Sequence, residues 1–179
     1  MRFLLDANVL LDFQNASLLP ALAKAADVIQ MAMAEQVFDE VTRPEPGDSS
    51  DLIGKKKQAA LVLQFAPIEV LEIFPGTPAA ALMRALVPLP SGRDQGEAAS
   101  IALAASDPDL LFVTGDKKGV LWALNELFHS GERVMRVPVF VRTLFERGVL
   151  EAAALKGVAE RAVAHGVIPS WWASWIAEQ

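Results

Sequence analysis

The sequence predicts an α/β fold of three layers, in which helices cover both faces of a central parallel sheet of about five strands. Short apolar runs alternate along the chain with longer segments whose apolar residues recur at helical spacing. Two of the runs, 3–5 and 110–113, are apolar throughout, which is typical of central strands covered on both faces.

The elements follow in order along the chain. Strands are expected at 2–5, 28–33, 68–73, 110–113 and 133–137, with the third near an edge of the sheet. Helices are expected at 17–26, 35–42, 52–65, 96–105 and 117–128, and again beyond the last strand. A further helix should begin at Pro78, because Thr77 can cap it and proline suits the first helical position.

The composition indicates one folded domain. The chain has 179 residues, of which 53% are hydrophobic and 21% charged, and this length can bury one core. We expect a single domain over 1–179, with 140–179 as a helical C-terminal extension. Trp171 and Trp175 share one helical face there, which favours docking of the tail on the core.

Membrane and secretory classes are disfavoured. No apolar run reaches the length of a bilayer span. Asp6 and Asp12 interrupt the first apolar stretch, and no small-residue cleavage site follows it. We therefore expect a cytoplasmic protein with no membrane partner.

The residue types available also restrict metal chemistry. The chain has no cysteine and only two histidines, His129 and His165. Any metal site must therefore rely on oxygen ligands, which suit Mg²⁺ or Mn²⁺. The net charge of −6 disfavours a nucleic-acid partner, although bound divalent cations would offset part of it.

Four acids lie where a parallel sheet places its functional crevice, beyond the carboxyl ends of its strands. Asp6 follows the first strand directly and Asp116 follows the fourth. Glu40 lies on the helix after the second strand, and Glu97 begins the helix before the fourth. If the first and fourth strands are neighbours, these carboxylates can hold divalent ions that activate water and stabilise charge on a phosphate.

Four motifs resemble the PIN-domain ribonucleases in order and spacing, across about the first two-thirds of the chain. They are FLLDANVLLD at 3–12, VFDEV at 37–41, GEAASIALA at 96–104 and FVTGDKK at 112–118. The resemblance implies a metal-dependent endoribonuclease that acts on RNA, with an acidic quartet made of Asp6, Glu40, Glu97 and Asp116.

The resemblance also implies polar neighbours and partners for the quartet. Asn8 is implied beside the site, and we expect Asp94 and Thr114 there as well. Many members of the family are toxins of toxin–antitoxin pairs and many form homodimers, so an antitoxin and a second copy of the chain are expected partners. Two positions depart from the pattern, since Ala7 replaces a common hydroxyl residue and Gly115 a common acid or asparagine.

Basic residues near these motifs are candidates for contacts with RNA phosphates. The alternative for the three consecutive lysines is a solvated helix face. The candidates are Arg43, Lys55, Lys56, Lys57, Arg93, Lys117 and Lys118.

Simpler structural roles remain open for several acids. Glu97 and Asp94 have the spacing of a capping box, and Asp116 can cap the helix that follows it. Asp12 is expected on the surface of a helix.

Two other functions remain as alternatives. A phosphohydrolase of the haloacid dehalogenase type also begins with a strand and an aspartate, but its general acid would fall at Asn8, which cannot donate the proton. A catalytically inactive binding module of the same fold is the second alternative, motivated by the acidic charge and by Ala7.

Overall fold

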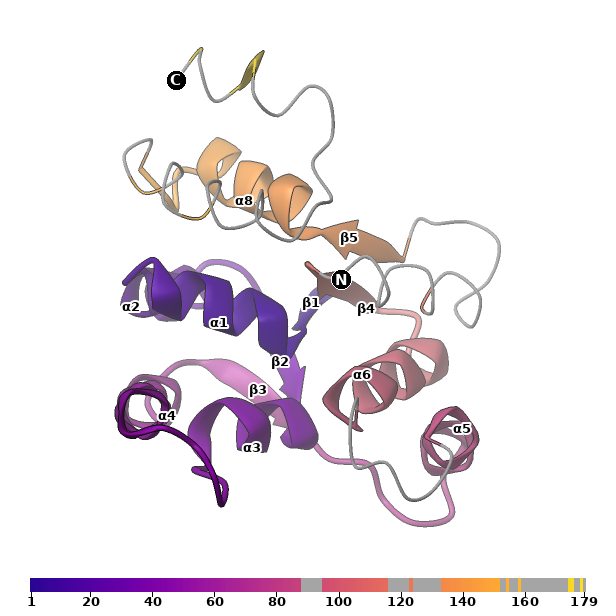
Figure 1. The fold of residues 1–179 in the computed structure, drawn as a ribbon. Helices are drawn as coiled ribbons and strands as arrows, with labels where there is room; N and C mark the ends of the chain where they lie inside the picture. The colour runs from indigo at the N-terminus through magenta and orange to yellow at the C-terminus, as the bar shows by residue number, and fades with distance from the viewer. Residues whose placement is uncertain are drawn as a thin grey trace.

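A computed structural model describes residues 1–87, 95–115 and 133–151, together with positions 123, 154, 158, 174, 175 and 178. Its centre is a parallel five-stranded sheet with the order β3-β2-β1-β4-β5 (Figure 1). The strands are β1 Arg2–Leu5, β2 Met31–Ala34, β3 Ile68–Leu71, β4 Leu110–Thr114 and β5 Val134–Arg136.

The strand positions confirm most of the sequence-based predictions. The apolar strands β1 and β4 lie side by side in the interior of the sheet, and β3 lies at an edge. The prediction for the second strand was wrong at its start. Val28 is exposed and its N–H donates to the carbonyl of Ala25, so this position continues the preceding helical turn and β2 begins only at Met31.

The described residues form seven helices. Their bounds are α1 Ala7–Asn15, α2 Leu19–Ala25, α3 Glu35–Thr42, α4 Ser50–Leu63, α5 Pro78–Leu86, α6 Gln95–Ser106 and α8 Val137–Glu146. The helix α3 has the predicted bounds, and Thr77 caps α5 by accepting from the N–H of Ala80. The helix α1 was missing from the predicted elements, although Asp6 gives it a side-chain N-cap. No helix in this part of the chain is long and apolar enough to cross a membrane.

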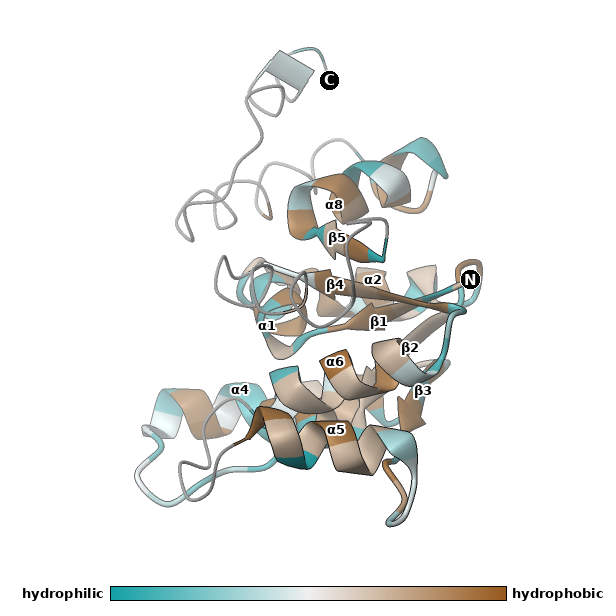
Figure 2. Cartoon of the chain, turned by 90° about the vertical axis from the view of Figure 1, so that its right-hand side faces the viewer, coloured by the Kyte–Doolittle hydropathy of each residue, from teal (hydrophilic) through white to brown (hydrophobic). Residues whose placement is uncertain are grey.

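Helices cover both faces of the sheet and make three layers (Figures 1 and 2). On one face, Phe3, Leu5 and their neighbours in the strands pack against α1, α2 and α8. On the other face, Leu4 and Phe112 pack against α6, and α5 packs on α6. Both apolar faces of the sheet are thus buried, as its parallel strands require.

The helix α8 belongs to the core although it follows the last strand. Phe140 is fully buried, with its ring centroid 5.3 Å from that of Phe3 on β1 and 6.4 Å from that of Phe13 on α1. Trp175 packs edge-on against Phe145 of α8 at 5.7 Å. This contact agrees with the expected docking of the tail, while Trp171 lies outside the described residues.

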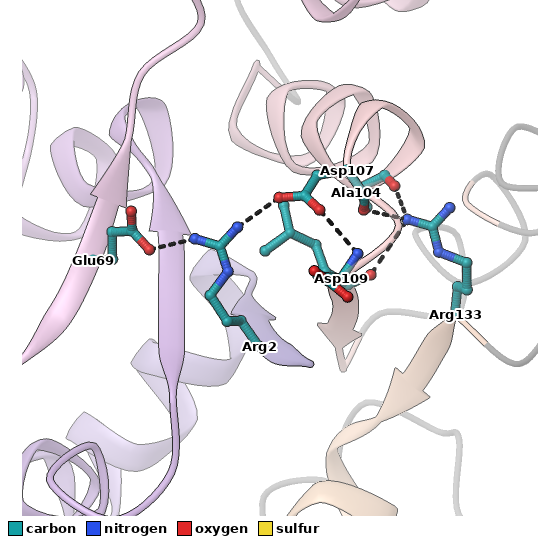
Figure 3. Close-up of polar contacts among 7 residues, drawn as sticks. Arg2, Glu69, Ala104, Asp107, Asp109 and Arg133 are labelled. Carbon is teal, nitrogen blue, oxygen red and sulfur yellow. Dashed lines mark hydrogen bonds and ion pairs between the residues drawn. The ribbon is translucent and has the colours of Figure 1, made fainter.

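Hydrogen bonds and ion pairs of charged side chains link the strands at the amino end of the sheet (Figure 3). Arg2 at the start of β1 donates to Glu69 of β3 and to Asp107 after α6, at 2.5 Å each. The hydrogen bond to Glu69 raises the pKa of Arg2 above its ordinary value. Arg133 donates to the carbonyls of Ala104 and Asp107 at the carboxyl end of α6. A positive charge there also interacts favourably with the negative end of the helix dipole. These contacts tie both sides of the sheet to its centre, at the end opposite Asp6.

Two charged residues that were expected on the surface are buried instead. Asp12 is 3% exposed and Lys56 is 7% exposed. The ammonium group of Lys56 lies 3.0 Å from the carboxylate of Asp48, and this opposite charge offsets part of the cost of burying it. The prediction of a solvated lysine face on α4 was therefore wrong at its middle residue.

The ion pair of Asp48 and Lys56 should make stability depend on pH. The backbone N–H of Glu45 and then Lys56 lower the pKa of Asp48 below its ordinary value of 3.8. A carboxyl group with a lowered folded-state pKa stabilises the fold above its unfolded-state pKa and loses this effect as the pH falls through the folded-state value. We expect Asp48→Asn to be less stable than the wild type at pH 7, with the difference shrinking below pH 3.8. Urea unfolding at several pH values measures it, and a difference that grows on acidification contradicts it.

Candidate functional site

Asp6 is held at the junction between β1 and α1. Its side chain is 3% exposed. One carboxylate oxygen accepts from the N–H of Ala7 at 2.8 Å, and the other accepts from the hydroxyl of Thr114 at 2.8 Å. The backbone N–H of Asp6 donates to the carbonyl of Val113. The carboxylate is thereby fixed at the carboxyl edge of the sheet.

The strand order explains why Asp6 and Thr114 meet. Leu5 pairs in register with Val113, so the residues that follow them leave the sheet next to each other. The expected polar neighbour Thr114 is thus in direct contact with Asp6. It is also fully buried.

Glu97 lies in the first turn of α6 and is 8% exposed. Because α6 leads back to the start of β4, its own first turn lies at the edge where the parallel strands end. Glu40 reaches the same turn from α3. A Cβ placed on Gly96 would come within 3.0 Å of a carboxylate oxygen of Glu40. The missing side chain at Gly96 therefore allows the carboxylate of Glu40 to approach the first turn of α6, which also carries Glu97.

Asp12 was missed as a neighbour of the site. A Cβ on Gly115 would lie 3.6 Å from a carboxylate oxygen of Asp12 and 3.9 Å from Cβ of Asn8. The chain leaving β4 therefore passes directly over this face of α1, just before Asp116. The spacing of four residues between Asn8 and Asp12 places both on one helical face, and this pattern could have pointed to Asp12.

The remaining predicted positions lie outside the described residues. They are Asp116 of the quartet, the polar neighbour Asp94, and the basic residues Arg93, Lys117 and Lys118. The histidines 129 and 165 also lie outside them.

The donor chemistry of the three described acids fits Mg²⁺ or Mn²⁺. Asp6, Glu40 and Glu97 offer only carboxylate oxygens, which these ions prefer. Within the described ranges, no three acidic or histidine side chains are already grouped closely enough to hold an ion. Asp116 lies outside the residues to which this finding applies.

An open cleft of about 750 Å³ adjoins the site. The helices α3 and α4, the loop between them, Leu11 of α1 and the start of α6 form its walls. Its lining residues are Leu11, Gln36, Asp39, Glu40, Arg43, Pro44, Glu45, Leu52, Lys56, Gln95 and Gly96. Glu40 and Gly96 thus belong both to the wall of the cleft and to the acidic site.

Three of the four candidate RNA-binding residues in the described part of the chain are already paired with acids. Arg43 contacts Asp39 at 2.7 Å, and Lys55 contacts Asp51 at 2.9 Å, each within one helical turn. Lys56 contacts Asp48. Lys57 is exposed. Contacts of these cations with RNA phosphates would compete with the acids that hold three of them.

Ser100 is a second residue that the sequence did not single out. It lies one turn after Glu97 on α6 and is fully buried, yet its hydroxyl has no hydrogen-bond partner. A buried hydroxyl left unpaired costs about 1–3 kcal/mol.

Comparison with models of protein families found no match, and comparison with curated proteins and with solved structures found none either.

Proposed function

We propose that this protein is a metal-dependent endoribonuclease of the PIN-domain type, which hydrolyses phosphodiester bonds in RNA. The observation that carries the proposal is the placement of Asp6, buried at the carboxyl end of β1 and hydrogen-bonded to Thr114 at the end of β4. The helices α3 and α6 bring Glu40 and Glu97 to the same edge of the sheet. Acids gathered at this edge suit phosphate chemistry better than a structural role.

The three described acids differ in exposure, so we assign them different roles. Asp6 and Glu97 are buried, so they suit the binding of Mg²⁺ or Mn²⁺, with Asp116 as the proposed third ligand. Glu40 is more exposed and suits a role in completing the site or orienting water. The bound ion supplies an activated water and stabilises negative charge on the phosphate. Thr114 keeps the carboxylate of Asp6 from rotating away.

Removal of the metal tests this proposal. We expect purified protein to cut RNA with Mg²⁺ or Mn²⁺, to stop in excess EDTA, and to recover when Mn²⁺ is restored. Cleavage of a fluorescent single-stranded RNA, followed on a gel, measures this. Activity that persists in EDTA, or an absence of cleavage with either ion, overturns the proposal.

A binding module that lacks catalysis is the second candidate. It is favoured by the ion pairs that already occupy Arg43, Lys55 and Lys56, three of the candidates for contacts with RNA phosphates. Calorimetry separates the two candidates, since the nuclease requires Mn²⁺ binding and the module does not.

As the toxin of a toxin–antitoxin pair, the nuclease would have an antitoxin and a second copy of itself as partners.

A further inference from the structure

We propose that the cleft between α3, α4 and α6 binds a base of the RNA, and that it selects guanine. This inference rests on the proposed nuclease function, which it extends from the reaction to the choice of cleavage site. The cleft and the acidic site share Glu40 and Gly96. A nucleotide seated in the cleft would therefore place its own or the adjacent phosphate next to the acids.

The charge of the cleft favours a base over a phosphate. Its lining holds three acids, Asp39, Glu40 and Glu45, and two cations, Arg43 and Lys56. Both cations are already paired with carboxylates, at 2.7 and 3.0 Å. A phosphate entering this cleft would meet net negative charge and no free cation among its lining residues, whereas a neutral base meets no such repulsion.

The hydrogen-bonding groups of the cleft indicate a ligand that donates. The side-chain oxygen of Gln36 and one carboxylate oxygen of Asp39 are buried and have no partner. Both side chains are partly exposed and line the cleft. Their terminal torsions are broad, so a small rotation can turn these oxygens toward a ligand. Accepting a bond there would remove the cost of two unpaired groups.

Guanine matches this arrangement best among the four bases. Its Watson–Crick edge presents two adjacent N–H donors, at N1 and N2, which can pair with the free oxygens of Asp39 and Gln36 while the other oxygen of Asp39 stays with Arg43. Uracil presents a single donor on that edge. Proteins read unpaired RNA bases on these edges, and a cleft of about 750 Å³ lies within the usual range for ligand sites.

Nucleoside binding tests the cleft separately from catalysis. We would titrate guanosine, cytidine and uridine into the Asp6→Asn variant without divalent metal, and follow binding by NMR. We expect guanosine to bind most tightly and to shift signals from α3. Asp39→Asn keeps the shape of the side chain but replaces an acceptor with a donor, and should weaken guanosine binding about tenfold or more. Gln36→Leu should also weaken it.

Asp51→Asn is the matched control. Asp51 also pairs with a cation four residues away on a helix, but it lies outside the lining of the cleft. Its guanosine affinity should equal that of the parent. Equal affinity for all three nucleosides, or unchanged binding in folded Asp39→Asn and Gln36→Leu, overturns the inference.

Mapping of cleavage sites in a random RNA pool distinguishes a failure of the guanine cleft from a failure of the proposed nuclease function. Cuts enriched beside guanine in the wild type, and less enriched in Asp39→Asn, support it. Cuts without base preference overturn the guanine cleft and leave the nuclease proposal standing. Guanosine binding without any RNA cleavage overturns the nuclease and leaves the cleft as a base-binding site.

Discussion

Asp6→Asn should abolish RNA cleavage and leave the fold in place. Asparagine caps helices about as well as aspartate, and its amide can donate to Thr114 once the hydroxyl turns. The substitution removes the charge that the proposed metal requires. Losing even about 3 kcal/mol of stabilisation in the transition state lowers the rate about 150-fold. Cleavage assays in Mn²⁺ and thermal unfolding, run on the same preparation, measure both effects.

Asp27→Asn provides the comparison for this loss. Asp27 is an exposed acid between α2 and β2, at the edge of the sheet opposite Asp6. The same chemical change there should leave both rate and stability unchanged. Full activity in Asp6→Asn, from material free of contaminating nuclease, removes Asp6 from the reaction.

Phe140→Ala should cause the largest loss of stability. The ring is fully buried between Phe3 of β1 and Phe13 of α1. Replacing such a residue with alanine typically costs 3–5 kcal/mol through lost burial and the cavity left behind. Urea denaturation followed by circular dichroism measures the free energy of unfolding.

Phe65→Ala is the corresponding surface change. Phe65 is 81% exposed at the end of α4, so its removal should alter stability by no more than about 0.5 kcal/mol. A loss below about 1 kcal/mol for Phe140→Ala would mean that α8 contributes little to the core, contrary to the packing described.

Local patterns were sufficient for much of the fold. Continuous apolar runs placed β1 and β4 at the centre of the sheet, and the alternating run placed β3 at an edge. Proline and threonine marked the start of α5. The start of β2 was missed because Val28 is apolar and β-branched, while the hydrogen bonds that end α2 depend on the folded chain.

The charge of a residue predicted its exposure less reliably than apolar patterns predicted the strands. Asp12 and Lys56 were placed on the surface because isolated charges are seldom buried. Lys56 is covered because Asp48, in the preceding loop, neutralises it. Asp12 is covered where the chain leaves β4 and passes α1, a contact between segments about a hundred residues apart. Neither partner is adjacent in sequence to the residue it buries.

The acids proposed for the candidate site and the neighbour Thr114 were singled out from the sequence, whereas the cleft beside them was not. Strand ends located Asp6, and the motif located Glu97. No local pattern indicated the cleft beside Glu40, since its walls come from four helices and the loop between α3 and α4. The unpaired oxygens of Gln36 and Asp39 became visible only once those walls were assembled.

The hydrogen bond between Thr114 and Asp6 spans 108 positions of the chain. A ribosome therefore makes Asp6 more than a hundred residues before it completes the strand that fixes it. A nascent chain that ends before β4 carries Asp6 without the hydroxyl of Thr114 that holds it and without Asp116. If the protein cuts RNA, the translating ribosome and its message are therefore not exposed to the assembled site until β4 has been synthesised.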